Sequence, residues 1–335
     1  MYKNATITIA AASARGVSEG FLHTRAAPPS YPLPFYCGPV KMGAVQVLSP
    51  GHTSHDNMKP LNTRGWTLQE GMLTRRMLVY GEKEQVWRCQ TEACKQFPAS
   101  PLSTFQDRAV LPPEAFDRVQ ALQPAAAHTL WGGIVIAYTS RKLSFREDRV
   151  SAVTGIIAEL KPLFDDKCVF GIWRKSFLRQ IAWARTSLLS GEKEDEDVLA
   201  CAPAWSWASR SFAVHFMAFQ PFDENCWKLR PDNSLVLTGL LRKGRDVPTT
   251  ERFSWRFQWD IRSPELLEYQ FVVEYSGNDV FYLLLGRESF REYRKFSMVL
   301  IPHERQGAYR RIGLVYNYLE TTTFDYGERE DILLA

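Results

Sequence analysis

The sequence lacks the short motifs that indicate the commonest enzyme chemistries. It has no phosphate-binding P-loop, no glycine fingerprint for dinucleotides and no nucleophile elbow of the serine hydrolases. Gly132-Gly133 is an isolated pair of glycines in none of these contexts. No nucleotide-binding or hydrolase class therefore follows from motifs alone.

Long apolar runs and a secretory leader are also missing. No apolar run approaches the roughly eighteen residues that a membrane-spanning helix needs. The N-terminus has no charged segment followed by an apolar stretch of signal length. We therefore expect an intracellular, cytoplasmic protein that has no membrane partner.

The sequence has little that could hold a metal. Among its six cysteines there is no Cys-x-x-Cys pair, and no zinc-type pair follows Cys89 and Cys94. His52 and His55 stand in a loop with prolines on both sides, which favours solvated histidines. The acidic run at 190–197 lacks the pattern of a calcium loop. We expect reduced thiols and no metal site.

Charge is low, whereas aromatic residues are abundant. The net charge of +4 is spread along 335 residues, so the sequence shows no footprint of nucleic-acid binding. Hydrophobic residues make up 45% of the chain and include ten tryptophans, enough for large cores. We expect a globular protein, of one large domain or two, whose partners are other proteins.

The stretch from Leu61 to Glu70 predicts the start of a helix with Thr63 as the N-cap. Helical spacing places Trp66 on one face, with Gln69 and Glu70 beside it. The structural interpretation is that Trp66 lies in the core and that Arg64 forms an ion pair with Glu70.

Two strands are expected after this helix, at 77–80 and 84–89, joined by a turn. This arrangement would bury Trp66 beneath the hairpin. Alternating residues predict further strands at 5–10 and 45–48. The Pro-rich stretch 26–39 excludes a regular helix.

Two helices are expected in the middle of the chain. The first runs from Arg149 to about Leu160, is capped by Asp148 and ends at Pro162. Its predicted apolar face consists of Val150, Val153, Ile157 and Leu160. The second helix opens at 171–173, and its inward residues are Phe177, Leu178, Ile181 and Trp183.

From residue 225 onward the pattern is β-rich. Short alternating segments separated by turn residues predict an antiparallel sandwich or barrel, followed by a frayed tail at 328–334. The expected strands are 234–241, 252–261, 268–275, 280–285, 296–301 and 309–316.

Two further indoles stand in the stretch Ala202–Ser209. Alternation in an extended segment places Trp205 and Trp207 on one face. Such a pair is either a wall of the core or a platform on which a ligand stacks.

The block Arg64-Gly-Trp-Thr-Leu-Gln-Glu70 resembles the last block of the fungal heterokaryon-incompatibility (HET) domain. Residues 1–11 resemble the family's Ile-Tyr-x-Asn-Ala segment, residues 138–160 its Tyr-Ser-x-Arg segment, and residues 202–209 its Pro-Ser-Trp-Ser-Trp-Ala-Ser segment. The family's two upstream blocks have no counterpart here, so we expect a chain that begins in the middle of the domain.

The resemblance implies a role in fungal non-self recognition and regulated cell death, as an interaction or signalling module that needs no cofactor. It also implies a partial α/β domain similar to Toll/interleukin-receptor (TIR) domains, some of which hydrolyse NAD with one glutamate. By that analogy Glu70 is the candidate catalytic residue. Arg64, Trp66, Gln69, Trp205 and Trp207 are candidate binding residues. Because half a domain should not close a water-excluding site, the interaction module is the preferred hypothesis.

The expected fold class is thus α+β. It comprises a partial HET region over residues 1–100, a helical linking region over 101–200 and a β-rich region over 201–335. We expect these regions to pack as one continuous body with two lobes, with Trp205 and Trp207 at the seam.

Overall fold

The computed structural model describes residues 1–24, 30–48, 60–82, 85–89, 122–186, 200–244, 256–259, 280–288, 295–317 and 329–335. The chain forms two compact units, Met1–Pro113 and Glu114–Ala335. The predicted β-rich region and the predicted helical region from residue 114 onward belong to the second unit. The predicted strand at 268–275, the histidines at 52 and 55, and the acidic run at 190–197 lie outside the described residues.

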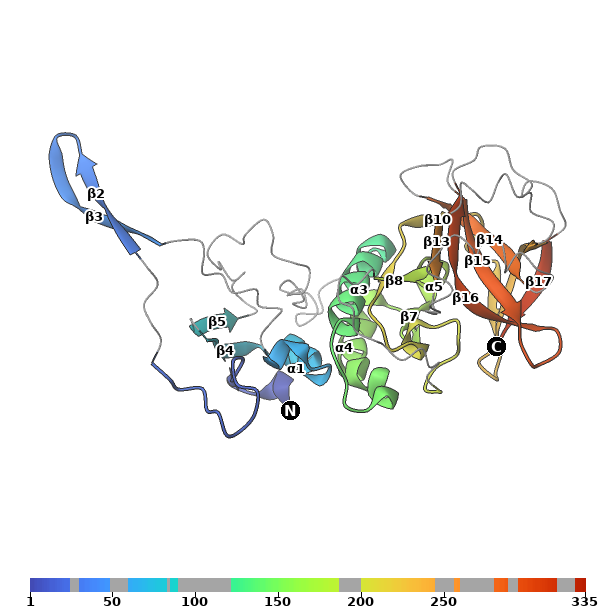
Figure 1. Cartoon of the computed structure of the whole chain (residues 1–335), viewed down its shortest axis with the longest axis horizontal. Coiled ribbons are helices and arrows are strands. Elements are labelled where there is room, and N and C mark those ends of the chain that lie inside the picture. Colours follow the sequence, from blue (N-terminus) through green and yellow to red (C-terminus); the bar gives the residue numbers. More distant parts are fainter. Residues whose placement is uncertain are drawn as a thin grey trace. The chain divides into compact units, whose positions relative to one another are not determined.

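The first unit contains a small α/β arrangement (Figure 1). Strand β1 (Thr8–Ala10) pairs in parallel with β4 (Arg76–Tyr80), which pairs antiparallel with β5 (Gln85–Cys89). The short helices η1 (Tyr2–Asn4) and η4 (Pro60–Thr63) precede β1 and α1 (Trp66–Leu73), respectively. The predicted succession of helix, strand, turn and strand is confirmed.

The first unit also contains a long antiparallel hairpin. It consists of β2 (Ser30–Cys37) and β3 (Val40–Leu48), joined at Gly38, which has a φ of 61°. The predicted strand at 45–48 lies within β3. Ser30 to Cys37 includes two prolines and forms a strand, in agreement with the exclusion of a helix there.

The helical part of the second unit begins with α3 (Pro124–Thr139), whose proline at the first position suits a helix start. The short helices η6 (Arg146–Arg149) and η7 (Ser151–Val153) lead into α4 (Thr154–Phe164). A tight hairpin of β6 (Cys168–Val169) and β7 (Ile172–Trp173) follows. The next elements are η8 (Arg174–Ser176), α5 (Phe177–Ile181), β8 (Trp183–Arg185), η9 (Trp207–Ser209), β9 (Val214–Phe216) and β10 (Phe219–Pro221).

The boundaries predicted for the first helix of this part were wrong at both ends. The α-helix begins at Thr154, because the segment around Arg149 is held in a tighter helix by tertiary hydrogen bonds, among them one from the Tyr138 hydroxyl to the Arg149 carbonyl (2.7 Å). Pro162 lies inside the last turn, and the helix continues to Phe164, which is buried. The buried face includes Ile156 rather than Ile157.

The second predicted helix is shorter than expected. Gly171 lies in a turn, Ile172–Trp173 forms the strand β7, and the helix α5 begins only at Phe177. The predicted inward side chains Phe177, Leu178, Ile181 and Trp183 are nevertheless buried, Trp183 at the start of β8.

The C-terminal part is a closed sheet. In chain order its strands are β10, which pairs with β14, then β11 (Trp227–Leu229), β12 (Leu235–Lys243), β13 (Arg256–Trp259), β14 (Phe281–Glu288), β15 (Lys295–Pro302), β16 (Ala308–Asn317) and β17 (Arg329–Leu334). Strands β14, β15, β16, β17 and β12 pair in succession, and β12 pairs back to β14, which closes a ring. All of these pairings are antiparallel except that of β16 with β17. The predicted antiparallel β-rich region is confirmed.

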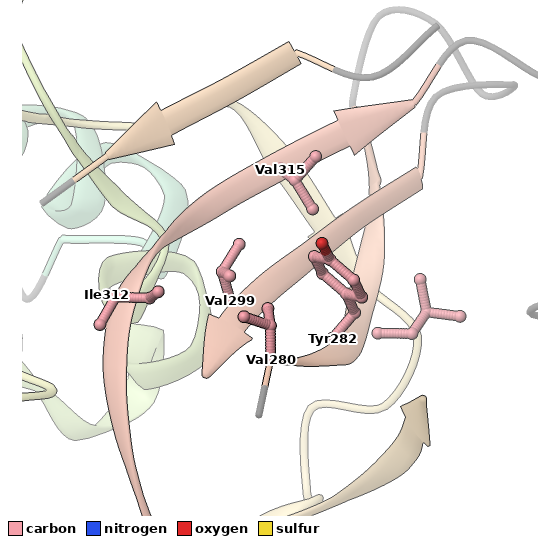
Figure 2. Packing of buried hydrophobic residues seen from close by; sticks show 6 residues of the cluster. Val280, Tyr282, Val299, Ile312 and Val315 are labelled. Atoms are coloured by element: carbon pink, nitrogen blue, oxygen red, sulfur yellow. The ribbon is translucent and has the colours of Figure 1, made fainter. Parts of the chain in front are cut away.

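The tail predicted to fray is instead the strand β17. It pairs with β12 over six residues, and its Ile332 and Leu334 are buried, so apolar burial holds the end of the chain in the sheet. One core of the ring gathers Val280, Tyr282, Leu284, Val299, Ile312 and Val315 (Figure 2). Among the described residues, no helix combines the length and apolar composition needed to cross a membrane.

Candidate functional site

The signature stretch forms the start of α1, but its capping differs from the prediction. Gly65 occupies the N-cap position, and Thr63 ends the preceding η4, where its hydroxyl donates to the Pro60 carbonyl (2.8 Å). The Thr67 hydroxyl lies within hydrogen-bond distance of two carbonyl oxygens, those of Leu61 (2.6 Å) and Arg64 (2.7 Å). The threonine inside the helix therefore ties the preceding turn to the first turn of α1.

The buried face of α1 is opposite to the predicted one. Leu68 and Met72 are 3% and 2% exposed, whereas Trp66 is 40% exposed. Residues 66 and 70 lie one turn apart on the face that faces away from Leu68 and Met72. The prediction that Trp66 is buried beneath the β4–β5 hairpin is thus wrong. The unit buries the two flexible aliphatic side chains and leaves the indole at the surface.

Four of the predicted site residues lie together because they share the first two turns of one helix and the residues before it. Gln69 and Glu70 are half-buried beside the exposed Trp66, and Arg64 is exposed just before the helix. We call Trp66, Gln69 and Glu70 the outer face of α1.

Glu70 has a partner that sequence reasoning missed. The Tyr2 hydroxyl, in η1, hydrogen-bonds the Glu70 carboxylate; burial raises the pKa of Tyr2, and this bond and the carboxylate's charge raise it further. Residues 2 and 70 come together because β1, just after η1, pairs with β4, just after α1. The sequence contains no local signal for this contact, because the two residues are 68 positions apart.

This arrangement can bind a ligand in two ways. A half-exposed indole offers an apolar surface with one N–H donor, and a carboxylate accepts hydrogen bonds from peptide or sugar groups. The phenol of Tyr2 fixes one side of that carboxylate. Together they form a surface that combines an aromatic ring with a charged acceptor.

The second pair of predicted binding residues lies in the core of the other unit. Trp205 and Trp207 are 0% exposed. The Trp205 indole N–H donates to the Asn233 carbonyl (3.2 Å), and that of Trp207 donates to the Gly171 carbonyl (2.9 Å). This burial supports their interpretation as a wall of the core and leaves neither ring a face for ligand stacking.

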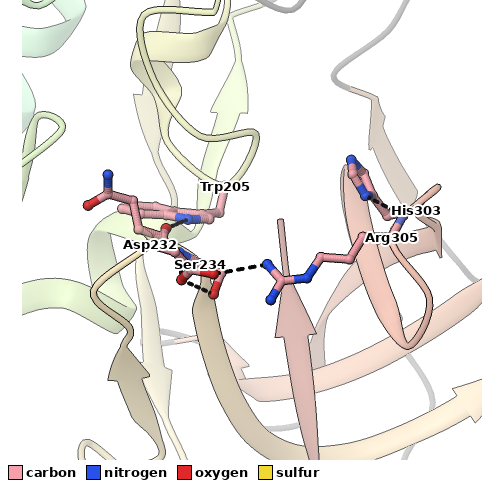
Figure 3. Close-up of polar contacts among 6 residues, drawn as sticks. Trp205, Asp232, Ser234, His303 and Arg305 are labelled. Atoms are coloured by element: carbon pink, nitrogen blue, oxygen red, sulfur yellow. Dashed lines mark hydrogen bonds and ion pairs between the residues drawn. The ribbon is translucent and has the colours of Figure 1, made fainter.

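The turn whose Asn233 carbonyl accepts the Trp205 N–H is stabilised by charged side chains (Figure 3). Asp232 accepts from the Ser234 hydroxyl (2.6 Å) and from the Arg305 guanidinium (3.0 Å). These two hydrogen bonds lower the pKa of the Asp232 carboxyl to about 2. The turn at 232–233 is the one that the sequence predicted before β12.

Two buried arginines organise the same unit. Arg149 is 3% exposed and donates to the carbonyls of Ser211 (3.2 Å) and Phe212 (2.6 Å). Arg311 is 1% exposed and donates to the carbonyls of Ile181 and Trp183. These hydrogen bonds give both arginines a structural role. The spacing of residues in the sequence does not indicate that role.

No metal centre emerges from the described part of the chain, where no group of three or more His, Cys, Asp or Glu side chains could hold an ion. Burial lowers the pKa values of His128 and His215, and this favours the neutral form of each imidazole. Comparison of the chain with models of protein families, with curated proteins and with solved structures found no match.

Proposed function

We propose that this chain is a HET-type interaction module, which takes part in fungal non-self recognition and regulated cell death through protein partners in the cytoplasm. The proposal rests on the resemblance of residues 1–11 and 64–70 to HET blocks. Packing supports it, because these two segments meet through the parallel β1–β4 pair and the bond between Tyr2 and Glu70.

The outer face of α1 is the proposed recognition surface, and the exposure of Trp66 is the observation that carries this proposal. Tryptophan at a surface is costly to leave in water and is enriched among the residues that dominate binding energy. At 40% exposure the ring retains apolar area that a partner can bury. Glu70 beside it supplies a charged acceptor that selects a complementary partner.

Inducible expression of the full chain in a filamentous fungus tests this function, with viable colony counts as the readout. We expect expression to reduce viability, and Trp66→Ala or Glu70→Gln to restore it at least about tenfold, since a truncated binding anchor typically costs more than 1.4 kcal/mol. Phe145→Ala, which removes a 70% exposed aromatic ring from the other unit, is the matched control and should leave the effect unchanged.

Protein levels and circular dichroism establish that each variant is folded. Unchanged viability on expression of the natural sequence would contradict the proposal. An equal effect of Phe145→Ala and Trp66→Ala would show that the outer face of α1 is not the recognition surface.

The second candidate function is NAD hydrolysis by a TIR-like mechanism. The observation that favours it is the bond from Tyr2 to Glu70, which fixes a carboxylate beside an indole. Glu70 would polarise the ribosyl bond while the Trp66 ring holds the nicotinamide. This function ranks second because both side chains face water, where a charge stabilises a transition state weakly.

Release of nicotinamide from NAD by the purified chain distinguishes the two functions. The interaction module predicts no release above that of a protein-free blank. Release that is lost in Glu70→Gln and retained in Glu82→Gln, an exposed glutamate of the same unit, would instead establish the enzyme.

A further inference from the structure

The β2–β3 hairpin exposes a continuous apolar face. Residues that pair directly across an antiparallel ladder point to the same side, and the register pairs Tyr31 with Val47, Leu33 with Val45, and Cys37 with Val40. Phe35 belongs to the same side by alternation. The six large side chains of this face are 41–62% exposed: Tyr31, Leu33, Phe35, Val40, Val45 and Val47. We call them the hairpin face.

The hairpin face needs a cover for a physical reason. A lone two-stranded hairpin is at best marginally stable in water, and most hairpins gain stability from a packed face. With about half of each side chain still accessible, the face offers roughly 500 Å² of apolar surface, which is at the upper end of what monomeric proteins expose.

The edge of β2 is closed to another strand, so the face rather than the edge is the place for a partner. Pro32 and Pro34 pair with Gln46 and Ala44. Because proline has no N–H, these residues leave the outer edge of β2 without two of the donors that a further strand would need.

The charge pattern favours an identical partner. The only charged residue of the two strands, Lys41, pairs with Tyr36, which places it on the side opposite the hairpin face. Two copies of the face can therefore meet without like charges being buried between them. Face-to-face packing of two such sheets at about 10 Å would bury roughly 1,000 Å², which is the lower bound for a specific interface.

We propose that the hairpin face binds the same face of a second copy of this chain, which makes the protein a dimer with a twofold axis through the paired hairpins. An isologous interface of this kind uses one patch twice and closes on itself, so it yields a dimer and not a filament. The inference is independent of the proposed function, because it uses no residue of the outer face of α1.

Sedimentation velocity of the full chain over a range of micromolar concentrations tests the proposal. We expect a dimer of twice the 38.4 kDa chain mass. Leu33→Asp should raise the dissociation constant at least about 100-fold, because it buries two like charges. Ala44→Asp places the same charge on the opposite side of the hairpin and is the matched control, which should remain dimeric.

Two additions keep the test decisive if Leu33→Asp fails to fold. The first is Leu33→Thr with Val45→Thr, which keeps β-branched residues in the strands and should still weaken the dimer. The second is a mixture of Leu33→Asp and Leu33→Lys chains, which should form a mixed dimer although neither associates alone.

A natural chain that stays monomeric throughout, or a Leu33→Asp chain as dimeric as Ala44→Asp, would overturn the proposal. Flotation of a monomeric chain with phosphatidylcholine vesicles would overturn it in favour of a lipid surface.

Discussion

At the scale of single residues, the buried side chains of Arg149 and Arg311 donate hydrogen bonds to backbone carbonyls. Arg311 donates to two carbonyls, and its guanidinium lies 3.6 Å from the centre of the Trp183 ring. Arg149 donates to two others and lies 5.8 Å from the Trp207 ring. A planar group with five donors suits this task, since it can bond several carbonyls at fixed angles while its face contacts an indole.

Asp232 illustrates how an exposed carboxylate acquires a strongly shifted pKa. The Ser234 hydroxyl, the Arg305 guanidinium and the Ser234 N–H all donate to it, and each donor favours the ionised form. The folded state therefore binds this proton more weakly than the unfolded chain, in which the pKa of an aspartate is about 4. The stabilisation is fully present above about pH 4 and is lost as the pH falls through about 2.

We predict that Asp232→Asn lowers the thermal midpoint at pH 5 and that the difference from the natural protein shrinks at pH 2. The physical reason is that the neutral amide has no charge to lose on acidification. Thermal unfolding at the two pH values measures both effects, and Glu304→Gln, an exposed carboxylate near the same turn, is the control. A difference in thermal midpoint that is the same at both pH values would contradict the lowered pKa of Asp232.

At the scale of elements, the tight β6–β7 hairpin is defined by the two indoles that converge on it. The Gly171 carbonyl accepts from the N–H groups of Trp131 (2.8 Å) and Trp207 (2.9 Å), which come from α3 and η9. Gly171 has a φ of 81°, and a Cβ there would lie 2.5 Å from a ring carbon of Trp207. Position 171 must therefore be glycine for two reasons: its φ is positive, and a Cβ would collide with the Trp207 ring.

We predict that Gly171→Ala lowers the free energy of unfolding by about 2–4 kcal/mol, because it strains the backbone and pushes the Trp207 ring away. Gly133→Ala is the matched control. That glycine lies inside α3 with no atom within 4 Å of the added carbon, so alanine should stabilise the helix by up to about 1 kcal/mol. Urea unfolding followed by tryptophan fluorescence compares them. Equal stabilities would show that the close approach has no energetic consequence.

At the scale of the second unit, the closed sheet and the helical part are joined by Arg311. Arg311 belongs to β16. Its two acceptors are the carbonyls of Ile181, at the end of α5, and Trp183, at the start of β8. Its own carbonyl lies 3.4 Å from a guanidinium nitrogen of Arg210, just after η9. The Arg311 side chain thus links β16 to the segment at Ile181 and Trp183, and its backbone carbonyl adds a contact with Arg210.

We predict that Arg311→Lys lowers the free energy of unfolding by about 2–4 kcal/mol, because an ammonium on a flexible stem cannot reproduce two divergent bonds and leaves a buried carbonyl unsatisfied. Arg310→Lys, the exposed neighbour on the same strand, should change it by less than about 0.5 kcal/mol. Urea unfolding at several temperatures measures both. Similar values for the two variants would exclude a structural role for Arg311.

Several elements were predictable from local pattern. The predicted strands 77–80, 234–241 and 296–301 are short, apolar-rich segments, and each lies on an observed strand to within a few residues. The burial of Trp205 and Trp207 was one of the two interpretations that the sequence left open. The pairing of Tyr2 with Glu70 was not predictable, because nothing local joins residues 68 positions apart.

Predictions failed where two local solutions have similar free energies. The helix α1 has apolar residues on both faces, so periodicity did not decide between Trp66 and the pair of Leu68 and Met72. The tail 329–334 is charged at its start and short, so only its pairing with β12 shows that it is a strand. Pro162 was expected to end a helix, but burial of Phe164 offsets the lost hydrogen bond.

The sequence by itself determined the class of elements, the α+β character and the turns, because these follow from spacing and backbone preference within a few residues. The tertiary structure alone decided which face of α1 is buried, how the C-terminal sheet closes and which carbonyls hold Arg149 and Arg311. These choices depend on the free energy of groups distant in sequence, and such contacts exist only once the chain has folded.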